Sequence, residues 1–444
     1  MHLVRDASLT SLASVGPVSA PSDTPPSAPR RPGLREAGAA FKVPEFRRFW
    51  IGALVSNSGS WMQNVSVPFV LYQLTESATW VGTASFAQFF PAVLFGPLGG
   101  SIADRYPRRS VLLVAQAAMA AIALALWALW SSGHAEPWSI TVLVALLGAT
   151  SGIAIGSWQA FVSELVPRDL LLNAVTLNSA QFNGARAFGP ALGGVVLATL
   201  GPSGAFALNA VSFVAVLGAL ASIPGRPAAI DPDAERSSVL GETRETIAYI
   251  RTMPGITACV VVVASVGFLG SPVFPLLAVF AEEVFAVGDS LYGLLGAALG
   301  IGGVLATPLV AGRGSGMLRS VLAGRGLVLY AASLVVFALS PVFPMAVVSL
   351  AVAGGAYLAV ASTLNTTIQV QVAEERRGKV LALYVMGLTS SYPIGSLVQG
   401  AIADVVGVRA VTAVAGVGLI LVWARIRTSG RFSMMDRLGD DDLG

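Results

Sequence analysis

The stretch Gly96-Pro-Leu-Gly-Gly-Ser-Ile-Ala-Asp-Arg-Tyr-Pro-Arg-Arg109 ends in a charged turn that separates two long apolar runs. Residues 80–103 contain no charged side chain, and residues 110–133 contain none either. A turn this short places the two runs antiparallel, as neighbouring helices. Asp104 and Arg108 are four residues apart, which is close enough for an ion pair where the first helix ends. The stretch therefore predicts a helical hairpin with a charged tip.

The three arginines of this turn anchor it at the cytoplasmic surface of a membrane if they follow the positive-inside rule. Its three glycines let a neighbouring helix approach backbone to backbone. The spacing Gly-x-x-x-Asp-Arg-x-x-Arg-Arg resembles the loop between helices 2 and 3 of the major facilitator superfamily, which usually has Gly where this chain has Pro107. The resemblance implies a gating role for Gly100, Asp104 and the arginines. The arginines are Arg105, Arg108 and Arg109, and the glycines are Gly96, Gly99 and Gly100.

Composition places most of the chain in lipid. Of its 444 residues, 55% are hydrophobic and only 11% are charged, against about 25% charged residues in soluble domains. So little polar surface cannot cover a water-soluble globule. Cys259 is the single cysteine, so an internal disulfide is excluded, and two peripheral histidines with one cysteine predict no metal site.

Twelve apolar segments follow Phe46, and each is long enough to cross about 30 Å of hydrocarbon as a helix. The sequence therefore predicts an all-α membrane protein with twelve transmembrane helices in two pseudo-symmetric halves of six. The expected spans are 47–73, 79–103, 110–131, 138–161, 172–199 and 203–223, then 256–281, 290–312, 318–340, 343–366, 378–402 and 406–424.

A polar segment between the sixth and seventh spans divides the halves. Residues 1–40 are rich in Pro, Ser, Ala and Gly and lack the apolar run of a signal peptide, so they predict a disordered tail. The expected organisation is a cytoplasmic tail at 1–43, a six-helix bundle at 44–224, a cytoplasmic central loop at 225–253, a second bundle at 254–425 and a cytoplasmic tail at 426–444.

The positive charges fix the expected orientation. With both termini in the cytoplasm, all 27 Lys and Arg residues except Arg186 and Arg409 fall on the cytoplasmic side. The positive-inside rule demands this asymmetry, and the reverse topology violates it. We therefore expect a multi-pass protein of the plasma membrane with cytoplasmic termini.

An internal repeat supports two related halves. Chance matching is the alternative in a chain with 48 glycines, but the matches across spans 4–5 and 10–11 need no gap. Two like-oriented halves are what an alternating-access transporter needs, with its substrate held between them near the middle of the membrane. A shift of 206 residues pairs Gly148 with Gly354, Gly189 with Gly395, Gly194 with Gly400 and Gly201 with Gly407, and a shift of 211 pairs Gly82 with Gly293.

Arg186 is the formal charge that lies deep inside an expected span. An arginine near the centre of a bilayer costs about 2.5–3.5 kcal/mol, so it should face a cavity or a partner. Ser179, Asn183 and Arg186 form one polar stripe at helical spacing. Two interpretations stay open: Arg186 binds an anionic or polar group of a substrate, or it caps carbonyls or binds a helix of the other half.

Three segments narrow the resemblance. Ser56-Asn-Ser-Gly-Ser-Trp-Met-Gln63, the segment that begins Glu164-Leu-Val-Pro-Arg-Asp169, and the segment from Phe182 to Gly194 are similar to the enterobactin-exporter-like branch of the superfamily. That branch implies export of siderophores, drugs or secondary metabolites. Pro190 removes one backbone hydrogen bond and the adjacent glycines permit bending, so a gate could flex there. Gly189, Pro190, Gly193 and Gly194 resemble the Gly-Pro signature in the fifth helix of antiporters of this superfamily, which we call the antiporter-like signature.

Aromatic and amide side chains within the spans could pack an aromatic or amphipathic substrate. The substrate-binding candidates are Trp61, Gln63, Asn178, Asn183, Arg186, Tyr357, Asn365 and Tyr384.

A proton gradient is one possible driving force, since 100 mV supplies about 2.3 kcal/mol per charge. The first span, 47–73, contains no Asp or Glu, so it lacks the coupling acid that other antiporters carry there. Asp104 and Asp404 are the remaining titratable candidates. We expect Asp104 to contact the start of the eleventh span beside Arg376 and Arg377, which would close the inner face.

The sequence predicts a transporter and no enzyme, because no acid–base–nucleophile set lies within the spans and no phosphate-binding loop is present. No folded basic domain points to nucleic acid. The expected function is secondary active efflux of a drug-like, siderophore-like or secondary-metabolite substrate by a monomer without a cofactor. An importer of a small polar solute and a transport-inactive membrane sensor or assembly partner are the alternatives.

Overall fold

The structure is a computed structural model that describes residues 38–225, 239–312 and 316–436. The expected tail at 1–37, part of the central loop at 226–238 and the last residues, 437–444, lie outside the described residues. Within the described ranges the regular secondary structure is helical.

The first half of the chain folds into long helices joined by short turns. The helix boundaries agree closely with the expected spans, and most helices extend a few residues beyond the expected ends. The elements are η1 (Ala39–Lys42), α2 (Pro44–Thr75), α3 (Ala78–Arg105), α4 (Arg108–Ser131), α5 (Pro137–Glu164), η2 (Arg168–Leu170) and α6 (Leu171–Ser222).

The second half begins with a short amphipathic helix and then repeats the pattern. Its seventh span is built from four consecutive helical pieces, two of which are π-helical. The elements are α7 (Val239–Thr252), α8 (Pro254–Ser265), η3 (Val266–Gly270), α9 (Val273–Val279), η4 (Phe280–Val284), α10 (Asp289–Ala311), α11 (Arg319–Leu339), α12 (Phe343–Gln371), α13 (Glu374–Val406), α14 (Val408–Thr428) and η6 (Ser433–Asp436).

Ten of the described helices are long and apolar enough to cross a membrane. This number is compatible with twelve crossings for two reasons. The long α6 counts once although it breaks at Gly201, whose φ of 64° and ψ of −175° end one helical segment and start the next. The α2 helix is not among the ten, because Ser, Asn and Gln interrupt its apolar sequence between residues 56 and 66.

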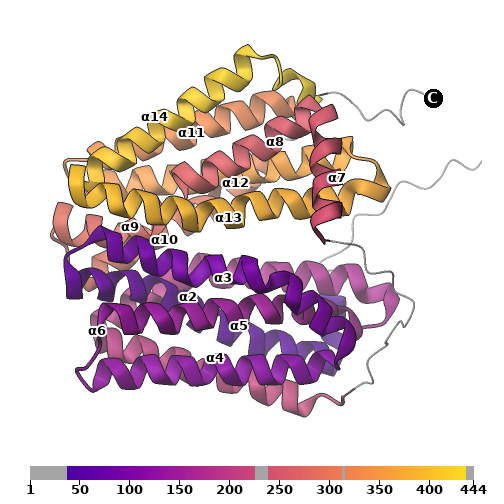
Figure 1. Ribbon diagram of the computed structural model, residues 1–444, viewed down its shortest axis with the longest axis vertical. Coiled ribbons are helices and arrows are strands. Elements are labelled where there is room, and N and C mark those ends of the chain that lie inside the picture. The colour runs from indigo at the N-terminus through magenta and orange to yellow at the C-terminus, as the bar shows by residue number, and fades with distance from the viewer. Residues whose placement is uncertain (1–37, 226–238, 313–315, 437–444) are drawn as a thin grey trace, which may run out of the picture.

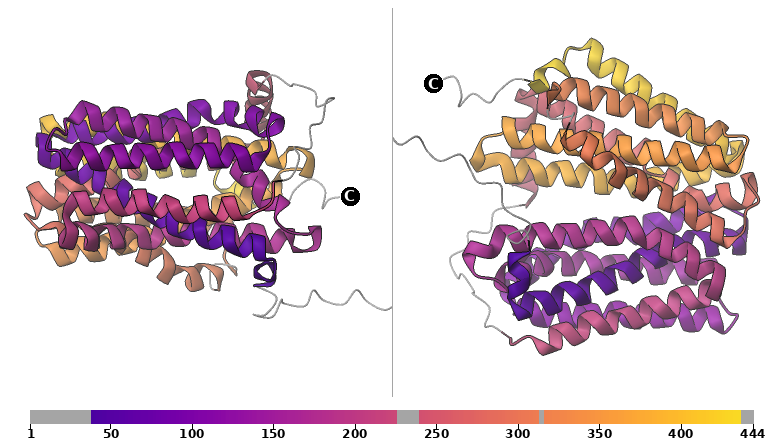
Figure 2. Two further views of the ribbon diagram at one scale, coloured as in Figure 1. Left: turned by 90° about the horizontal axis from the view of Figure 1, so that it is seen from below. Right: turned by 180° about the vertical axis from the view of Figure 1, so that it is seen from behind.

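The helices form two bundles that lie one above the other in Figure 1, with α2–α6 in the lower bundle and α8–α14 in the upper one. Each bundle is held by its own helix pairs, such as α2 with α6 and α3 with α5 below, and α11 with α12 above. At one end of the molecule lie α7 and the chain's exits toward both termini, and at the other lies α9 (Figures 1 and 2). We call these the α7 end and the α9 end.

The internal repeat is present in three dimensions. A Cβ atom built on Gly148 would lie 2.0 Å from the carbonyl oxygen of Gln88, and one built on the repeat-related Gly354 would lie 1.9 Å from that of Leu299. Each glycine therefore lets two helices of one bundle touch through their backbones. Gly407 also has a positive φ, 86°, between α13 and α14, as Gly201 has within α6.

The charged turn closes differently from the sequence prediction. Arg108 pairs with Glu164 at the end of α5, so the expected ion pair with Asp104 is wrong. The reason is that α3 ends at Arg105 and α4 starts at Arg108, so the four-residue spacing does not run along one helix. Arg109 donates to the carbonyl oxygens of Leu220 and Ala221 in the last turn of α6, where carbonyls lack the usual partner four residues on.

The glycines of the opening stretch are not equivalent. A Cβ atom on Gly99 would lie 2.4 Å from the carbonyl oxygen of Ile153 in α5, so close helix approach is confirmed there. A Cβ atom on Gly156 of α5 would lie 3.3 Å from the Cα of Gly100, so α5 also approaches the backbone there, although a Cβ on Gly100 itself would meet nothing within 4 Å. Gly96 also has nothing within 4 Å of its Cβ position, so the structure does not show it at this helix approach.

Replacing Gly99 by alanine should destabilise the first bundle by about 1–3 kcal/mol, because the added methyl group meets backbone rather than a movable side chain. Gly96→Ala is the matched control one helical turn away, and it should be neutral or slightly stabilising, since alanine is the better helix former. Thermal unfolding of the two purified variants in detergent measures the difference. Equal melting temperatures would contradict the assigned contact.

Candidate functional site

The two bundles meet most closely toward the α9 end, where α3 packs on α13 and α6 packs on α10. A Cβ atom on Gly194 would lie 2.2 Å from the Cα of Gly293, and one on Gly293 would lie the same distance from the Cα of Gly194. The repeat-related contact joins Gly400 to Gly82, with 3.1 Å between the added Cβ and the Cα. These four glycines allow the backbones of opposite bundles to touch.

Asp404, in the last turn of α13, caps the first turn of α3 in the other bundle. Its carboxylate accepts hydrogen bonds from the Oγ of Ser77 at 2.6 Å, the N–H of Ala78 at 2.6 Å and the N–H of Thr79 at 3.1 Å. The N–H groups that begin a helix have no partner inside it, and the helix dipole favours a negative charge there. We call this contact the Asp404 cap.

Tyrosines complete the closure at the α9 end. The ring of Tyr292 stacks on Phe69 with 5.0 Å between centroids, and its hydroxyl donates to the carbonyl oxygen of Val65 at 2.8 Å. The hydroxyl of Tyr72 donates to Glu283 at 3.2 Å. The hydrogen bonds named here between the bundles all lie toward the α9 end, so this structure is sealed on that side.

At the α7 end, the partners expected for Asp104 are engaged elsewhere. Arg376 lies 3.8 Å from the carboxylate of Glu245 and over the ring of Tyr249, both on α7. Arg377 donates to the carbonyl oxygen of Val372. Asp104 is exposed. The structure therefore does not show the predicted contact of Asp104 with the start of α13, and that contact stays a prediction for a conformation closed at the α7 end.

Arg186 lies between the bundles, near the middle of the spans. Its guanidinium carbon lies 5.6 Å from the ring centroid of Trp61 in α2 and 5.9 Å from that of Tyr357 in α12. Arg186 belongs to α6, so one cation joins two aromatic rings from opposite bundles. Its side chain is nevertheless exposed, and the N–H groups that point away from the rings are therefore able to bind an anion.

Further aromatic rings extend this centre, and the sequence analysis did not single them out. Phe182 and Phe274 lie with their ring centroids 6.2 and 6.5 Å from that of Trp61. Tyr330 packs against Tyr357 at 5.9 Å. They come from α6, α9 and α11, so nothing in their sequence spacing could reveal that they meet.

The two asparagine candidates of α6, Asn183 and Asn178, differ in their surroundings. Asn183 is exposed on the same face of α6 as Arg186 and Ser179, and its side chain donates to the Ser179 carbonyl. Asn178 accepts a long hydrogen bond, 3.4 Å, from the indole of Trp158. The predicted polar stripe is therefore present on α6, on an exposed face.

Three candidates lie outside this centre. Gln63 is 1% exposed and accepts a hydrogen bond from Asn209 of α6, so it stands inside the first bundle. Tyr384 is 6% exposed, and its hydroxyl donates to the Ala361 carbonyl, one turn from Tyr357. Asn365 accepts from Gln369 on its own helix.

In the antiporter-like signature of α6, the glycines make close helix contacts, and the helix does not break at Pro190. A Cβ atom on Gly189 would lie 2.4 Å from the Cβ of Trp61, and one on Gly193 would lie 3.2 Å from the Met62 carbonyl oxygen. Gly194 meets the other bundle, and α6 continues as a helix through Pro190. The signature thus places Trp61 against α6, beside Arg186.

Two bundles of repeat-related helices that enclose a polar centre and close at one end define a transporter of the major facilitator type. The profile of the transmembrane secretion effector family matches residues 36–438, so the chain belongs to that family, whose members are transporters and not enzymes.

The chain is 27% identical to the staphyloferrin A transporter of Staphylococcus aureus, across 82% of this chain and 91% of that one. It is 26% identical to the enterobactin exporter of Citrobacter koseri, across 85% and 90%. Among solved structures, it resembles a bacterial homologue of the human lysosomal transporter Spinster with a TM-score of 0.71 at 14% identity, across 92% of this chain and 100% of that one, which shows the shared fold.

Removing the Asp404 cap should open the α9 end. A helix cap contributes about 0.5–2 kcal/mol, so Asp404→Ala should shift the equilibrium roughly 2- to 30-fold toward the conformation that is open there. Spin labels at Ser132→Cys and Val342→Cys, one in each bundle at this end, report the distance between the bundles when the buried Cys259 is replaced by alanine.

Glu136→Ala is the matched control, because Glu136 caps the start of α5 within the first bundle. It should leave the distance distribution of the two labels unchanged. An unchanged distribution for Asp404→Ala, or the same shift in both variants, would contradict the role of the Asp404 cap.

Proposed function

We propose that the protein is a secondary active exporter that carries a siderophore-like, drug-like or secondary-metabolite substrate out of the cell by alternating access. The observation that carries this proposal is Arg186, a cation held between Trp61 and Tyr357 of opposite bundles. A substrate bound there contacts both bundles, so its binding and release are coupled to their relative movement. Its relatives include a siderophore exporter and multidrug and macrolide efflux proteins, and they support the direction of transport.

The proposed orientation places the α7 end in the cytoplasm of a plasma-membrane protein. Among the described residues, every Lys and Arg except Arg186 and Arg409 lies toward that end. The positive-inside rule then assigns it to the cytoplasm, with both termini and the central loop. The conformation sealed at the α9 end would thus receive substrate from inside, which is the loading state of an exporter. We propose that the protein works as a monomer. Its two six-helix bundles would comprise residues 44–224 and 254–425.

The proposed substrate has an anionic or strongly polar group beside an aromatic or flat apolar part. Arg186 would bind the first, since hydrogen bonds to a charged group are about twice as strong as neutral ones. Trp61 and the neighbouring Phe182 and Phe274 would contact the second. The alternative, that Arg186 caps carbonyls or binds a helix of the other half, accounts for its position near Tyr357 of α12 but not for the exposure of its side chain.

Arg186→Gln should reduce export roughly 10- to 100-fold, the loss expected when a hydrogen bond to a charged group worth about 1.5–3 kcal/mol is removed. Arg186→Lys should retain part of the activity, since it keeps the charge but not the planar fork. The measurement is efflux of a siderophore or a macrolide from cells that lack their own exporters.

The matched control is Arg409→Gln, which also removes a cation that lies near a ring, that of Phe285, but at the α9 end. It should keep most of the export activity. Higher cellular accumulation of the substrate in expressing cells would indicate an importer instead, and no change in any cell would indicate a sensor or an assembly partner.

We further propose that a proton gradient drives this export. In proteoliposomes without ATP, an imposed gradient should accelerate transport of the substrate identified above, and an uncoupler should abolish the acceleration. Transport that ignores the gradient and the uncoupler would contradict proton coupling while leaving the export direction intact.

A further inference from the structure

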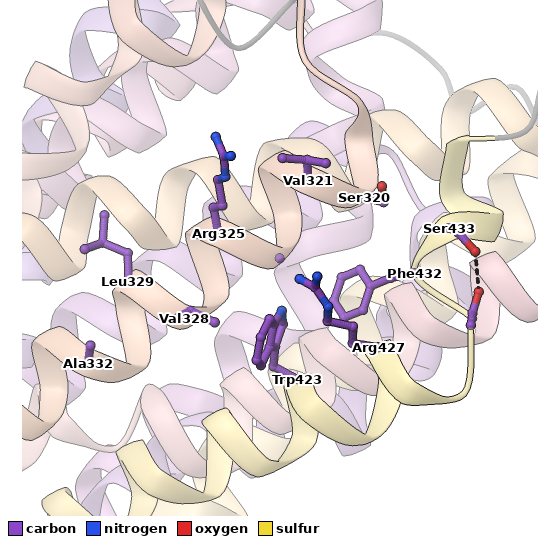
Figure 3. A pocket seen from close by; sticks show the side chains of 12 residues that line it. Ser320, Val321, Arg325, Val328, Leu329, Ala332, Trp423, Arg427, Phe432 and Ser433 are labelled. Atoms are coloured by element: carbon purple, nitrogen blue, oxygen red, sulfur yellow. Dashed lines mark hydrogen bonds between the residues drawn. The ribbon is translucent and has the colours of Figure 1, made fainter.

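A hollow of about 670 Å³ lies between α11 and α14 at the α7 end, on the second bundle (Figure 3). Its volume is within the range of small-molecule sites, about 300–1,000 Å³. The walls come from the first half of α11, the end of α14 and the segment that follows α14. The lining residues include Ser320, Gly324, Arg325, Trp423, Arg427 and Phe432.

The end of the hollow nearest the α7 end is cationic. Arg427 lies over the indole of Trp423, with its guanidinium carbon 5.2 Å from the ring centroid. In Figure 3 both side chains project from α14 beside Phe432, while Arg325 extends from α11 in another direction, away from Arg427. In the described part of the chain, neither arginine forms an ion pair and the indole N–H of Trp423 has no hydrogen bond. The two guanidinium groups and the indole N–H therefore line the hollow with no hydrogen-bond acceptor bound to them among the described residues.

The arrangement is built into the backbone. A Cβ atom on Gly324 would lie 3.1 Å from Nε1 of Trp423, so the glycine leaves the room that the indole occupies. The carboxylate of Asp436 accepts from the N–H and the hydroxyl of Ser320, which fixes the segment after α14 to the start of α11. Because Asp436 is engaged there, it does not neutralise the arginines.

The other end of the hollow leads into an apolar groove. A second hollow of about 510 Å³ lies between α11 and α12 and shares Leu329 and Ala332 with the first. From Ser320 to Val336 the two extend along seventeen residues of α11, which is about 24 Å for sixteen steps of 1.5 Å. One leaflet contributes about 15 Å of hydrocarbon, half of the 30 Å core. The length thus fits one head group followed by one acyl chain.

Both hollows open toward lipid and away from the substrate site. In Figure 1, α11 and α14 lie on the side of the upper bundle that faces away from the lower bundle. Large apolar side chains are exposed on this surface, and in a multi-pass membrane protein they contact hydrocarbon. They include Leu329, Val336, Leu339, Val414, Val417 and Leu421.

We propose that this groove binds one anionic phospholipid from the leaflet at the α7 end. Arg427 holds the phosphate, Arg325 turns toward it from α11 when the lipid binds, the indole N–H of Trp423 donates to the head group, and an acyl chain lies along Leu329 and Ala332. Charge complementarity selects an anionic lipid, because a zwitterionic head group brings an ammonium group to two unpaired guanidinium groups. Basic pockets between transmembrane helices on the cytoplasmic side bind acidic head groups by the same physics.

The test is native mass spectrometry of the purified full chain titrated with phosphatidylglycerol or cardiolipin, with phosphatidylcholine as the neutral lipid. The wild type should retain one anionic lipid more tightly than phosphatidylcholine. The double variant Arg325→Gln and Arg427→Gln should bind it about 30-fold more weakly, because each basic contact contributes about 1 kcal/mol. Ala332→Phe, which fills the junction of the two hollows, should also weaken binding while leaving both arginines in place.

The matched control is Arg425→Gln with Arg431→Gln, which removes two exposed charges at the same end that do not line the hollow. It should keep wild-type lipid binding. Equal loss in both double variants would show a general surface charge and overturn the proposal. Equal retention of phosphatidylcholine would overturn it as well. Displacement by glycerol phosphate alone would identify a soluble phosphate ligand and overturn the lipid proposal, and absence of bound lipid in every titration would overturn it as well.

Discussion

Close backbone contact through glycine is the constraint on which this structure depends. In lipid, helices gain nothing by hiding apolar side chains from one another, so they associate through close packing and hydrogen bonds. Gly148 and Gly354 provide that packing inside each bundle, and Gly194 with Gly293 provides it between bundles. The same device therefore packs the helices within each half and joins the two halves to each other.

The pairing of α3 with α13 joins the two bundles and carries the Asp404 cap. The two helices are antiparallel, so the last turn of each lies at the same end of the molecule as the first turn of the other. Each carries an aspartate in its last turn, Asp104 in α3 and Asp404 in α13. Asp404 reaches the free N–H groups of its partner in this structure, and Asp104 does not. The contact of Asp104 with the start of α13 stays a prediction for a conformation closed at the α7 end.

The sequence predicted the spans well because crossing a bilayer leaves a long uncharged run that can be read residue by residue. It also predicted that Arg186 faces a cavity or a partner, since an isolated charge in such a run needs one, and the structure places its guanidinium beside Trp61 and Tyr357. The sequence failed to predict side-chain contacts that depend on which helices pack against each other. Arg108 pairs with Glu164 rather than Asp104, and Gln63 turns into the first bundle to meet Asn209. Phe274 and Tyr330 join the centre from helices that no spacing connects to it.

Length, apolar runs, the positions of Lys and Arg and the glycine repeat were therefore determined by the sequence alone, because each is a one-dimensional consequence of crossing lipid. The tertiary structure decided which faces of the helices meet. It brought Trp61 and Tyr357 to Arg186, Asp404 to the start of α3, and Arg427 to the groove beside α11. These contacts join residues far apart in the chain, and their distances follow from how the helices pack. Hydropathy and the spacing of residues along the chain do not encode that packing.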